Sequence, residues 1–274
     1  MVLIGACPMG KENPKWPRTG EPATDRTTRP RDSDRRDHVS NVSSQYRCHV
    51  ELIVHDTPDA ATQAASKRIA DLISTVEGRV SFGLAGGLAA EATYRMLRGR
   101  ATGWDKVDAW LSDERWVPPD HERSNGHMAA VTLLDHVDAN FIRPRWSEYL
   151  EPEDAAAHYD ARLRSIHAGR PPDLIMLGMG ADAHVASLFP DTPALAERSR
   201  WYVANRETGD GEDRLTATYP LLWSASLVLV VTLGIDKAVA LKASFEGGTP
   251  AGQLSEAEGV VEWYVDRDAA SLLS

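Results

Sequence analysis

Residues 173–190 read DLIMLGMGADAHVASLFP, and this stretch decides the fold of the chain. The apolar run from Asp173 to Leu177 predicts a buried β-strand, and the glycines after it predict a turn. Asp182 and His184 therefore follow the carboxyl end of a strand, which is where open α/β sheets bind ligands. Histidine can act as a base near neutral pH, and a carboxylate two residues away can orient its ring. The alternative interpretation is a polar turn that only caps the strand.

Two further segments join a predicted strand to a glycine-rich or charged turn. Residues 81–90, SFGLAGGLAA, predict a strand, a glycine turn and the start of an amphipathic helix. Paired glycines let the backbone approach an anion, and free amides at a helix N-terminus favour a phosphate there. Residues 107–118, VDAWLSDERWVP, predict a strand that runs into a charged cluster, with Ser124 and Asn125 downstream. The chain thus carries three candidate ligand-binding turns at strand ends.

Strand and helix signals alternate from residue 48 onward, which is typical of a parallel sheet covered by helices on both faces. The predicted strands are His49–Val54, Val80–Leu84, Val107–Ser112, Leu174–Leu177, Leu227–Leu233 and Val260–Val265. The predicted helices are one from a Thr57 or Asp59 cap to Glu77, then Leu88–Arg98, Gly126–His136, Pro152–Ala168, Pro220–Ser226 and Lys237–Glu246. We therefore expect a single α/β domain.

The composition fits one enzyme-sized domain. The chain has 274 residues, of which 42% are hydrophobic, enough to bury a substantial core. Its formal net charge of −10 argues against a surface for nucleic acid or an anionic membrane, since either needs a basic face. Cys7 and Cys48 indicate neither a disulfide framework nor a metal site, so a cytoplasmic location is the simplest expectation. No apolar run approaches the ~20 residues of a membrane span.

Residues 1–46 differ in composition from the rest of the chain. They contain five prolines and the mixed-charge run RDSDRRD at 31–37, with almost no periodic apolar residues. Such a segment buries too little apolar surface to offset the entropy of ordering it. We expect a disordered N-terminal extension at 1–46 and a catalytic domain at 47–274. An Arg-rich targeting arm is the alternative, and the interleaved acids weigh against it.

Taken in order, the motifs resemble the 6-phosphogluconolactonase family. The shared features are the Gly-Gly loop at 86–87, DERWVP at 113–118 with its downstream Ser-Asn, and LGMGADAHVASLFP at 177–190. A fourth block agrees, with RLT at 214–216, a helix, a strand and GIDKA at 234–238. The resemblance covers roughly residues 49–269. It implies a Rossmann-like parallel-sheet sandwich related to sugar-phosphate isomerases. It also implies hydrolysis of 6-phospho-D-glucono-1,5-lactone to 6-phosphogluconate in the pentose phosphate pathway.

Lactone hydrolysis needs a base and a group that faces the carbonyl oxygen. His184 is the predicted general base, and Asp182 would fix its ring or the substrate. Arg115, or backbone amides near Gly180, would face the oxygen that gains negative charge. Asp113 belongs to the same predicted catalytic cluster. The alternative for Arg115 is a surface ion pair with a neighbouring acid.

The substrate phosphate needs cations or amides. The resemblance implies that Lys237 and Arg214 hold the 6-phosphate, with the amides of Gly86 and Gly87 completing a cradle. Asn125 joins this predicted substrate-binding group. The alternative for Lys237 is a solvated helix residue. We expect no cofactor and no metal, and a sugar-phosphate lactone as the ligand of a monomer or homodimer that binds neither nucleic acid nor membrane.

Two departures from the family pattern bear on activity. The loop that usually reads Ser-Gly-Gly-Ser-Thr-Pro has no hydroxyl here, since residues 85–90 read AGGLAA. Each hydrogen bond lost to a charged group removes about 1.5–3 kcal/mol. The usual Asp-Gly-His is Asp182-Ala183-His184, and an alanine forced to positive φ costs on the order of 1 kcal/mol.

These departures leave two alternatives to a lactonase. A non-catalytic sugar-phosphate-binding homologue is suggested by the loop without hydroxyls. A glucosamine-6-phosphate deaminase or isomerase shares the broad fold and an Asp-x-His segment. Those enzymes typically carry Asp-Glu-Tyr and a glutamate shortly after the histidine. This chain has Arg115 at the tyrosine position and no acid between His184 and Asp191, which disfavours the isomerase class.

Overall fold

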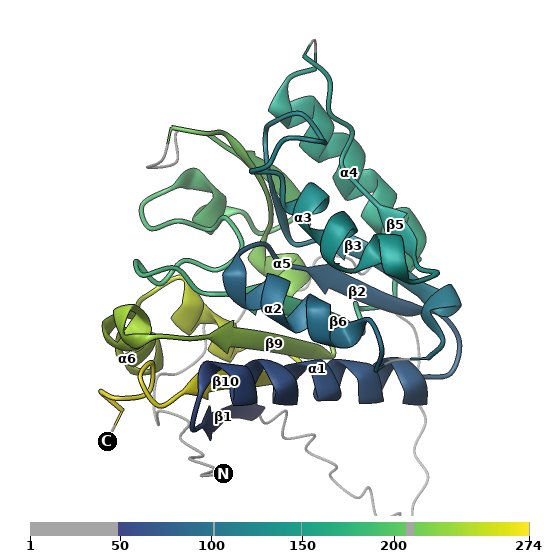
Figure 1. Ribbon diagram of the computed structural model, residues 1–274. Helices are drawn as coiled ribbons and strands as arrows, with labels where there is room; N and C mark the ends of the chain where they lie inside the picture. The colour runs from purple at the N-terminus through teal and green to yellow at the C-terminus, as the bar shows by residue number, and fades with distance from the viewer. Residues whose placement is uncertain (1–48, 101, 149, 207–210, 274) are drawn as a thin grey trace, which may run out of the picture. The chain divides into compact units, whose positions relative to one another are not determined.

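A parallel β-sheet is the framework of the protein (Figure 1). The computed structural model describes residues 49–100, 102–148, 150–206 and 211–273, so the predictions for residues 1–46 and for both cysteines lie outside the described residues. Its strands are β1 His49–His55, β2 Val80–Leu84, β3 Val107–Leu111, β5 Asn140–Ile142, β6 Leu174–Gly178, β9 Leu227–Thr232 and β10 Val260–Asp266. They lie in the order β1-β10-β9-β6-β2-β3-β5, and every neighbouring pair is parallel.

Helices cover both faces of this sheet, as the sequence predicts. The α-helices are α1 Pro58–Thr75, α2 Leu88–Leu97, α3 Asn125–Thr132, α4 Pro152–His167, α5 Tyr219–Ser224 and α6 Ala238–Glu246. The 3-10 helices are η1 Trp104–Lys106, η2 Leu134–His136, η3 Pro193–Ala196, η4 Ile235–Lys237 and η5 Ala251–Glu256. Within the described ranges, none of the helices is both long and apolar enough to cross a membrane.

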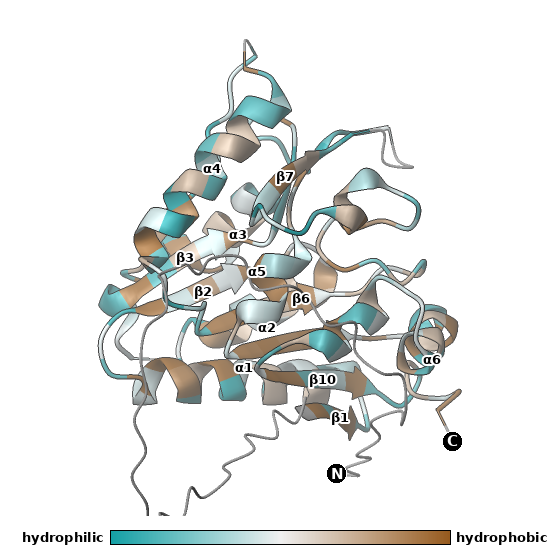
Figure 2. Ribbon diagram, turned by 180° about the vertical axis from the view of Figure 1, so that it is seen from behind, coloured by the Kyte–Doolittle hydropathy of each residue, from teal (hydrophilic) through white to brown (hydrophobic). Residues whose placement is uncertain are grey.

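Two hydrophobic cores lie on opposite faces of the sheet. Successive side chains of a strand point to opposite faces, and β9 divides accordingly. Its residues Leu227, Leu229 and Val231 belong to the core shared with α1, α2 and α3. Val228 and Val230 belong to the core shared with α4, α5 and α6. Figure 2 shows hydrophobic colour along β1 and along parts of β10. The fold class is therefore confirmed.

Helix ends follow local signals, with two differences from the predicted ranges. The hydroxyl of Thr57 accepts a hydrogen bond from Ala60 N at 3.2 Å and caps α1, as predicted. The helix predicted at 126–136 divides into α3 and η2, because Leu133 leaves the helical φ range (φ −138°) and is fully buried. Lys237, predicted to begin a helix, ends η4 directly before α6.

The edge strand β5 of the parallel sheet and a second, antiparallel sheet were not predicted. The antiparallel sheet consists of β4 Asp113–Arg115, β8 Arg214–Ala217 and β7 Tyr202–Asn205, in the order β4-β8-β7. The chain passes into it directly from the parallel sheet, since Ser112 N donates to Leu84 O at 2.7 Å and Ser112 O accepts from Ala217 N at 2.7 Å. The small sheet therefore begins at the carboxyl end of β3.

The connections of the parallel sheet diverge between β2 and β6. From β2 the chain goes through α2 to β3 on one side, whereas β6 lies beside β9 on the other side. Ligands in open α/β sheets bind outside the carboxyl ends of strands at such a switch point. The loops after these strands are adjacent here: a Cβ built on Gly178 would lie 4.0 Å from Gly86 O.

Candidate active site

A pocket of about 1090 Å³ opens where the loops after β2, β4 and β6 meet. It is lined by every residue that the sequence analysis assigned to a site. These are Asp113, Arg115, Asp182 and His184 from the catalytic set, and Gly86, Gly87, Asn125, Arg214 and Lys237 from the binding set. Three loops, the small sheet and η4 therefore supply one cavity from positions far apart in the sequence.

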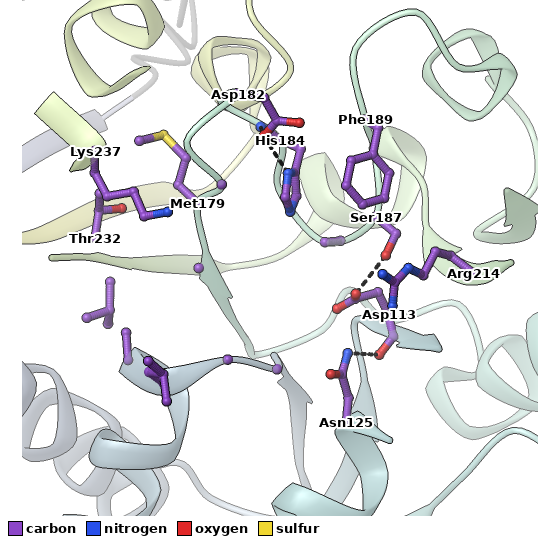
Figure 3. Close-up of a pocket in the computed structure, with 18 of the residues that line it drawn as sticks. Asp113, Asn125, Met179, Asp182, His184, Ser187, Phe189, Arg214, Thr232 and Lys237 are labelled. Atoms are coloured by element: carbon purple, nitrogen blue, oxygen red, sulfur yellow. Dashed lines mark hydrogen bonds and ion pairs between the residues drawn. The ribbon is translucent and has the colours of Figure 1, made fainter. Parts of the chain in front are cut away.

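Asp182 and His184 form a direct acid–imidazole pair (Figure 3). The Asp182 Oδ1 to His184 Nδ1 distance is 2.6 Å, and the same oxygen accepts from His184 N at 3.3 Å. A carboxylate can only accept, so the proton of a neutral imidazole lies on Nδ1. Nε2 then carries the free lone pair, which is the requirement for a general base.

The turn that carries this pair is tightly fixed. Gly180 N donates to His184 O at 2.9 Å, Ala183 N donates to Gly180 O at 3.0 Å, and Ala251 N donates to Ala183 O at 2.9 Å. Ala183 is buried and has φ +63°, so this alanine does occupy the conformation in which glycine is favoured. The strain is on the order of 1 kcal/mol, and the hydrogen bonds hold the turn in place.

The chain after His184 is anchored to the small sheet. The Phe189 ring lies 4.3 Å from the imidazole, centroid to centroid. Ser187 N donates to Thr216 Oγ1 at 3.0 Å, Ser187 O accepts from Asn205 Nδ2 at 2.8 Å, and Ser187 Oγ donates to Asp113 Oδ2 at 2.7 Å. Sequence reasoning missed Ser187, although it lies in the quoted stretch, because a serine in a turn gives no signal of its partners.

The side chains of Asp113, Glu114 and Arg115 point alternately to the two sides of β4. Asp113 and Arg115 line the pocket, whereas Glu114 points the other way and is buried. Its carboxylate accepts hydrogen bonds from Asn125 N at 2.7 Å and from Gly126 N at 2.9 Å. Burial raises the pKa of Glu114, and these hydrogen bonds offset part of that rise. Glu114 thus anchors the first turn of α3, and with it the side chain of Asn125.

Asn125 joins the glycine loop to Arg115. Its Oδ1 accepts from Arg115 Nη1 at 2.7 Å, and its Nδ2 donates to Asp113 O at 3.0 Å. A Cβ on Gly86 would lie 2.1 Å from Asn125 Oδ1, so only glycine fits beneath this amide. The close approach of the Asn125 side chain is therefore the physical reason that position 86 is a glycine.

Arg115 does not form the ion pair with a sequence neighbour that was its alternative interpretation. Its Nη1 donates to Arg123 O at 2.8 Å, and its Nε lies 3.9 Å from Glu212 Oε2. Arg214 Nη1 lies 3.6 Å from the same Glu212 oxygen. Glu212 therefore contacts both pocket arginines. Sequence reasoning missed it, because an acid in a polar segment carries no signal of this contact.

The opposite end of the pocket is formed by α2 and η4. Gly87 has φ +92° and precedes α2, whose first-turn amides have no acceptor within the helix. Leu88 and Ala89 line the pocket in place of hydroxyl residues. Lys237 Nζ lies 3.3 Å from Asp236 Oδ2. Figure 3 shows Lys237 on one side of His184 and Arg214 on the other.

No group of three or more His, Cys, Asp or Glu side chains that could hold a metal ion occurs among the described residues. The pocket itself is lined by a candidate base, hydrogen-bond donors and cations. Those groups suit attack of water on a polar carbonyl in an anionic substrate.

Comparisons with known proteins give the family of the chain. The sequence model of glucosamine-6-phosphate isomerases/6-phosphogluconolactonase matches residues 56–263. A 6-phosphogluconolactonase of Nostoc sp. (strain PCC 7120) is 34% identical over 209 residues, covering 72% of this chain and 86% of the relative. That of Synechocystis sp. (strain PCC 6803) is 33% identical over 235 residues, covering 81% and 95%. The crystal structure of a devB protein matches with a TM-score of 0.75 and 26% identity, covering 82% of this chain and 100% of that one.

Proposed function

The chain belongs to the glucosamine-6-phosphate isomerase/6-phosphogluconolactonase family, and we propose that within it the protein is a 6-phosphogluconolactonase. It hydrolyses 6-phospho-D-glucono-1,5-lactone to 6-phosphogluconate in the pentose phosphate pathway. The observation that carries this conclusion is the 2.6 Å pair of Asp182 and His184 inside the pocket. The location in the cytoplasm, the monomeric or homodimeric state and the domain boundary after residue 46 remain predictions from the sequence.

His184 is the proposed base of the first step. A water molecule gives a proton to Nε2 while its oxygen bonds to the lactone carbonyl carbon, C1. The Asp182 carboxylate then stabilises the imidazolium through Nδ1–H. A positioned general base contributes about 10²–10⁴ in rate. The carbonyl oxygen becomes negative in the tetrahedral intermediate, and Arg115 is the proposed donor to it.

The second step opens the ring. The bond between C1 and the ring oxygen breaks, and the imidazolium returns its proton to that oxygen as it leaves. C1 becomes a carboxylic acid, which ionises to a carboxylate at neutral pH. His184 is again neutral, so the cycle closes without a net change in the protein.

The 6-phosphate is proposed to lie at the α2 and η4 end. The first-turn amides of α2 and the ammonium of Lys237 both favour an anion there. The side chains of Leu88 and Ala89 supply no donor, so backbone amides carry more of this contact than in the hydroxyl-bearing family pattern. Weaker phosphate binding is the expected consequence.

The non-catalytic binder is the main alternative, and one assay separates the two. Freshly generated lactone is mixed with the purified protein, and product formation is compared with spontaneous hydrolysis in buffer. A lactonase raises the rate in proportion to protein concentration, and His184→Gln removes most of that increase while 6-phosphogluconate still binds. A wild-type rate equal to that of buffer would overturn the proposed activity.

A further inference from the structure

The residues that line the pocket carry more negative than positive charge. With His184 neutral as the base, three cations stand against four carboxylates: Arg115, Arg214 and Lys237 against Asp113, Asp182, Asp191 and Asp236. A cleft steers an anionic ligand when its lining carries the opposite sign of charge. The whole chain also has a formal net charge of −10. A phosphate dianion therefore gains little from the field of the pocket and depends on local contacts.

Asp236 already meets the positive charge at the α2 and η4 end. Its Oδ2 lies 3.3 Å from Lys237 Nζ, and both residues line the pocket. The side chain of Asp236 is 67% exposed, so its carboxylate lies on the open side of the ammonium group. A phosphate that reaches Lys237 has to share the ammonium with this carboxylate, and the two anions repel each other. Asp236 thus reduces what Lys237 contributes to phosphate binding.

The rest of this end is largely apolar. Leu88 is the first residue of α2, lines the pocket and is 85% exposed. Ala89 and Leu233 line the pocket as well, and neither side chain has a donor. The hydroxyl oxygen of Thr232 is buried, so it presents no exposed donor to a ligand. A charged group is costly to desolvate against such a surface, whereas an uncharged CH2OH group loses much less.

The groups proposed to act at the lactone carbonyl do not depend on this end. His184 receives its hydrogen bond from or to Asp182, and Figure 3 shows Asp113 and Arg214 on the opposite side of His184 from Lys237. A remote part of a substrate raises the rate only through the contacts that it makes. A 1,5-lactone with CH2OH in place of the phosphate ester presents the same carbonyl to His184. Its reaction should therefore lose little.

We propose that the protein also hydrolyses aldono-1,5-lactones that carry no phosphate, and that Asp236 limits its preference for the phosphorylated substrate. The inference rests on the proposed lactonase activity, which supplies the base. The chemical step is the same for both lactones. The oxygen of water bonds to C1, the bond between C1 and the ring oxygen breaks, and the ring oxygen takes the proton that His184 received from water.

Initial rates with two lactones test this activity. D-Glucono-1,5-lactone and freshly generated 6-phospho-D-glucono-1,5-lactone are each mixed with the purified protein, and the spontaneous rate in buffer is subtracted. A single net contact to a charged group contributes about tenfold or more. We therefore expect kcat/KM for the phosphorylated lactone to exceed that for glucono-1,5-lactone by less than about tenfold. A larger ratio would overturn the proposal.

Asp236→Asn should increase the selectivity for the phosphate. The variant removes the competing charge and keeps the size of the side chain, so the ratio of the two kcat/KM values should rise about 3- to 10-fold. Glu246→Gln is the matched control, because Glu246 lies 3.8 Å from Lys242 in α6 and outside the pocket lining. Its ratio should equal that of the wild type. An unchanged ratio in Asp236→Asn, or an equal rise in both variants, would exclude Asp236 as the residue that limits the preference.

His184→Gln assigns the two reactions to one site. It should lower both enzymatic rates by the same factor, and glucono-1,5-lactone hydrolysis that survives it would contradict the inference. A protein that hydrolyses only the phosphorylated lactone contradicts this inference alone. A protein that hydrolyses only glucono-1,5-lactone contradicts the proposed 6-phosphogluconolactonase alone. The two proposals therefore fail by different results.

Discussion

Gly180→Ala should disable the catalytic turn without unfolding the protein. An alanine Cβ would lie 2.2 Å from His184 Nδ1, 2.3 Å from His184 Cε1 and 2.4 Å from Asp182 Oδ1. Two hydrogen bonds of 2.9 Å hold the backbone of this turn, one from Gly180 N to His184 O and one from Ala251 N to Ala183 O. The side chains must therefore move, and both have solvent beside them, since 28% of His184 and 47% of Asp182 are exposed.

The expected effects on stability and activity differ greatly. Displacing partly exposed side chains should change the free energy of unfolding by less than about 1 kcal/mol, or about 2–4 °C in Tm. A general base contributes about 10²–10⁴ in rate, and it does so only when it reaches the attacking water. We therefore expect kcat to fall by at least about 10²-fold.

Initial rates of lactone hydrolysis and thermal melts measure the two effects. Gly99→Ala is the matched control, because a Cβ there meets no atom within 4 Å, and it should behave as wild type. A folded Gly180→Ala protein with the wild-type kcat would refute the reasoning. It would mean that the alignment of His184 with Asp182 does not drive hydrolysis.

Three further predictions address the base, the phosphate and the fold. His184→Gln should lower kcat about 10²–10⁴-fold and leave the Kd for 6-phosphogluconate within a few-fold, and lost affinity with unchanged turnover would contradict its role. Leu88→Ser combined with Ala89→Thr should tighten 6-phosphogluconate binding about tenfold for each contact regained, and unchanged affinity in calorimetry would remove the phosphate from α2. Burial lowers the pKa of His167 below its ordinary value of 6.5, so the unfolded chain takes up the proton first as pH falls. The free energy of unfolding should thus fall below pH 6.5, by up to about 1.4 kcal/mol per pH unit from this group. Urea unfolding between pH 5 and 7.5 should show a shallower dependence for His167→Gln, and an identical slope would exclude this histidine as the cause.

Six of the seven strands of the parallel sheet could be predicted from their apolar residues, whereas the three-residue strand β5 was not predicted. β9 reads LVLVVT and is buried along its whole length, so a continuous apolar run is enough to identify it. The glycine loop and the acid–imidazole turn follow such strands directly. The rule that ligands bind at carboxyl ends then places them together before any contact is known.

The small sheet could not be predicted, because its strands are short and begin with charge. β4 is Asp113–Arg115, whose three residues are all charged, and such a triplet is typical of a loop. It becomes a strand only because β8 pairs with it across about a hundred residues of sequence. That pairing turns the side chain of Asp113 toward the pocket and the side chain of Glu114 away from it. The contacts of Glu212 with both pocket arginines follow from it too.

The pocket thus combines two frameworks that can change independently. The parallel sheet carries α2 and η4, whereas β4 and β8 carry Asp113, Arg115 and Arg214 at the pocket. In evolution, substitutions in β4 and β8 could adapt the pocket to a new reaction while the proposed phosphate site at α2 and η4 stayed unchanged. A chimera that receives β4 and β8 together from a relative with different chemistry would preserve their cross-strand register. Exchanging either strand alone would separate partners that have to change as a unit.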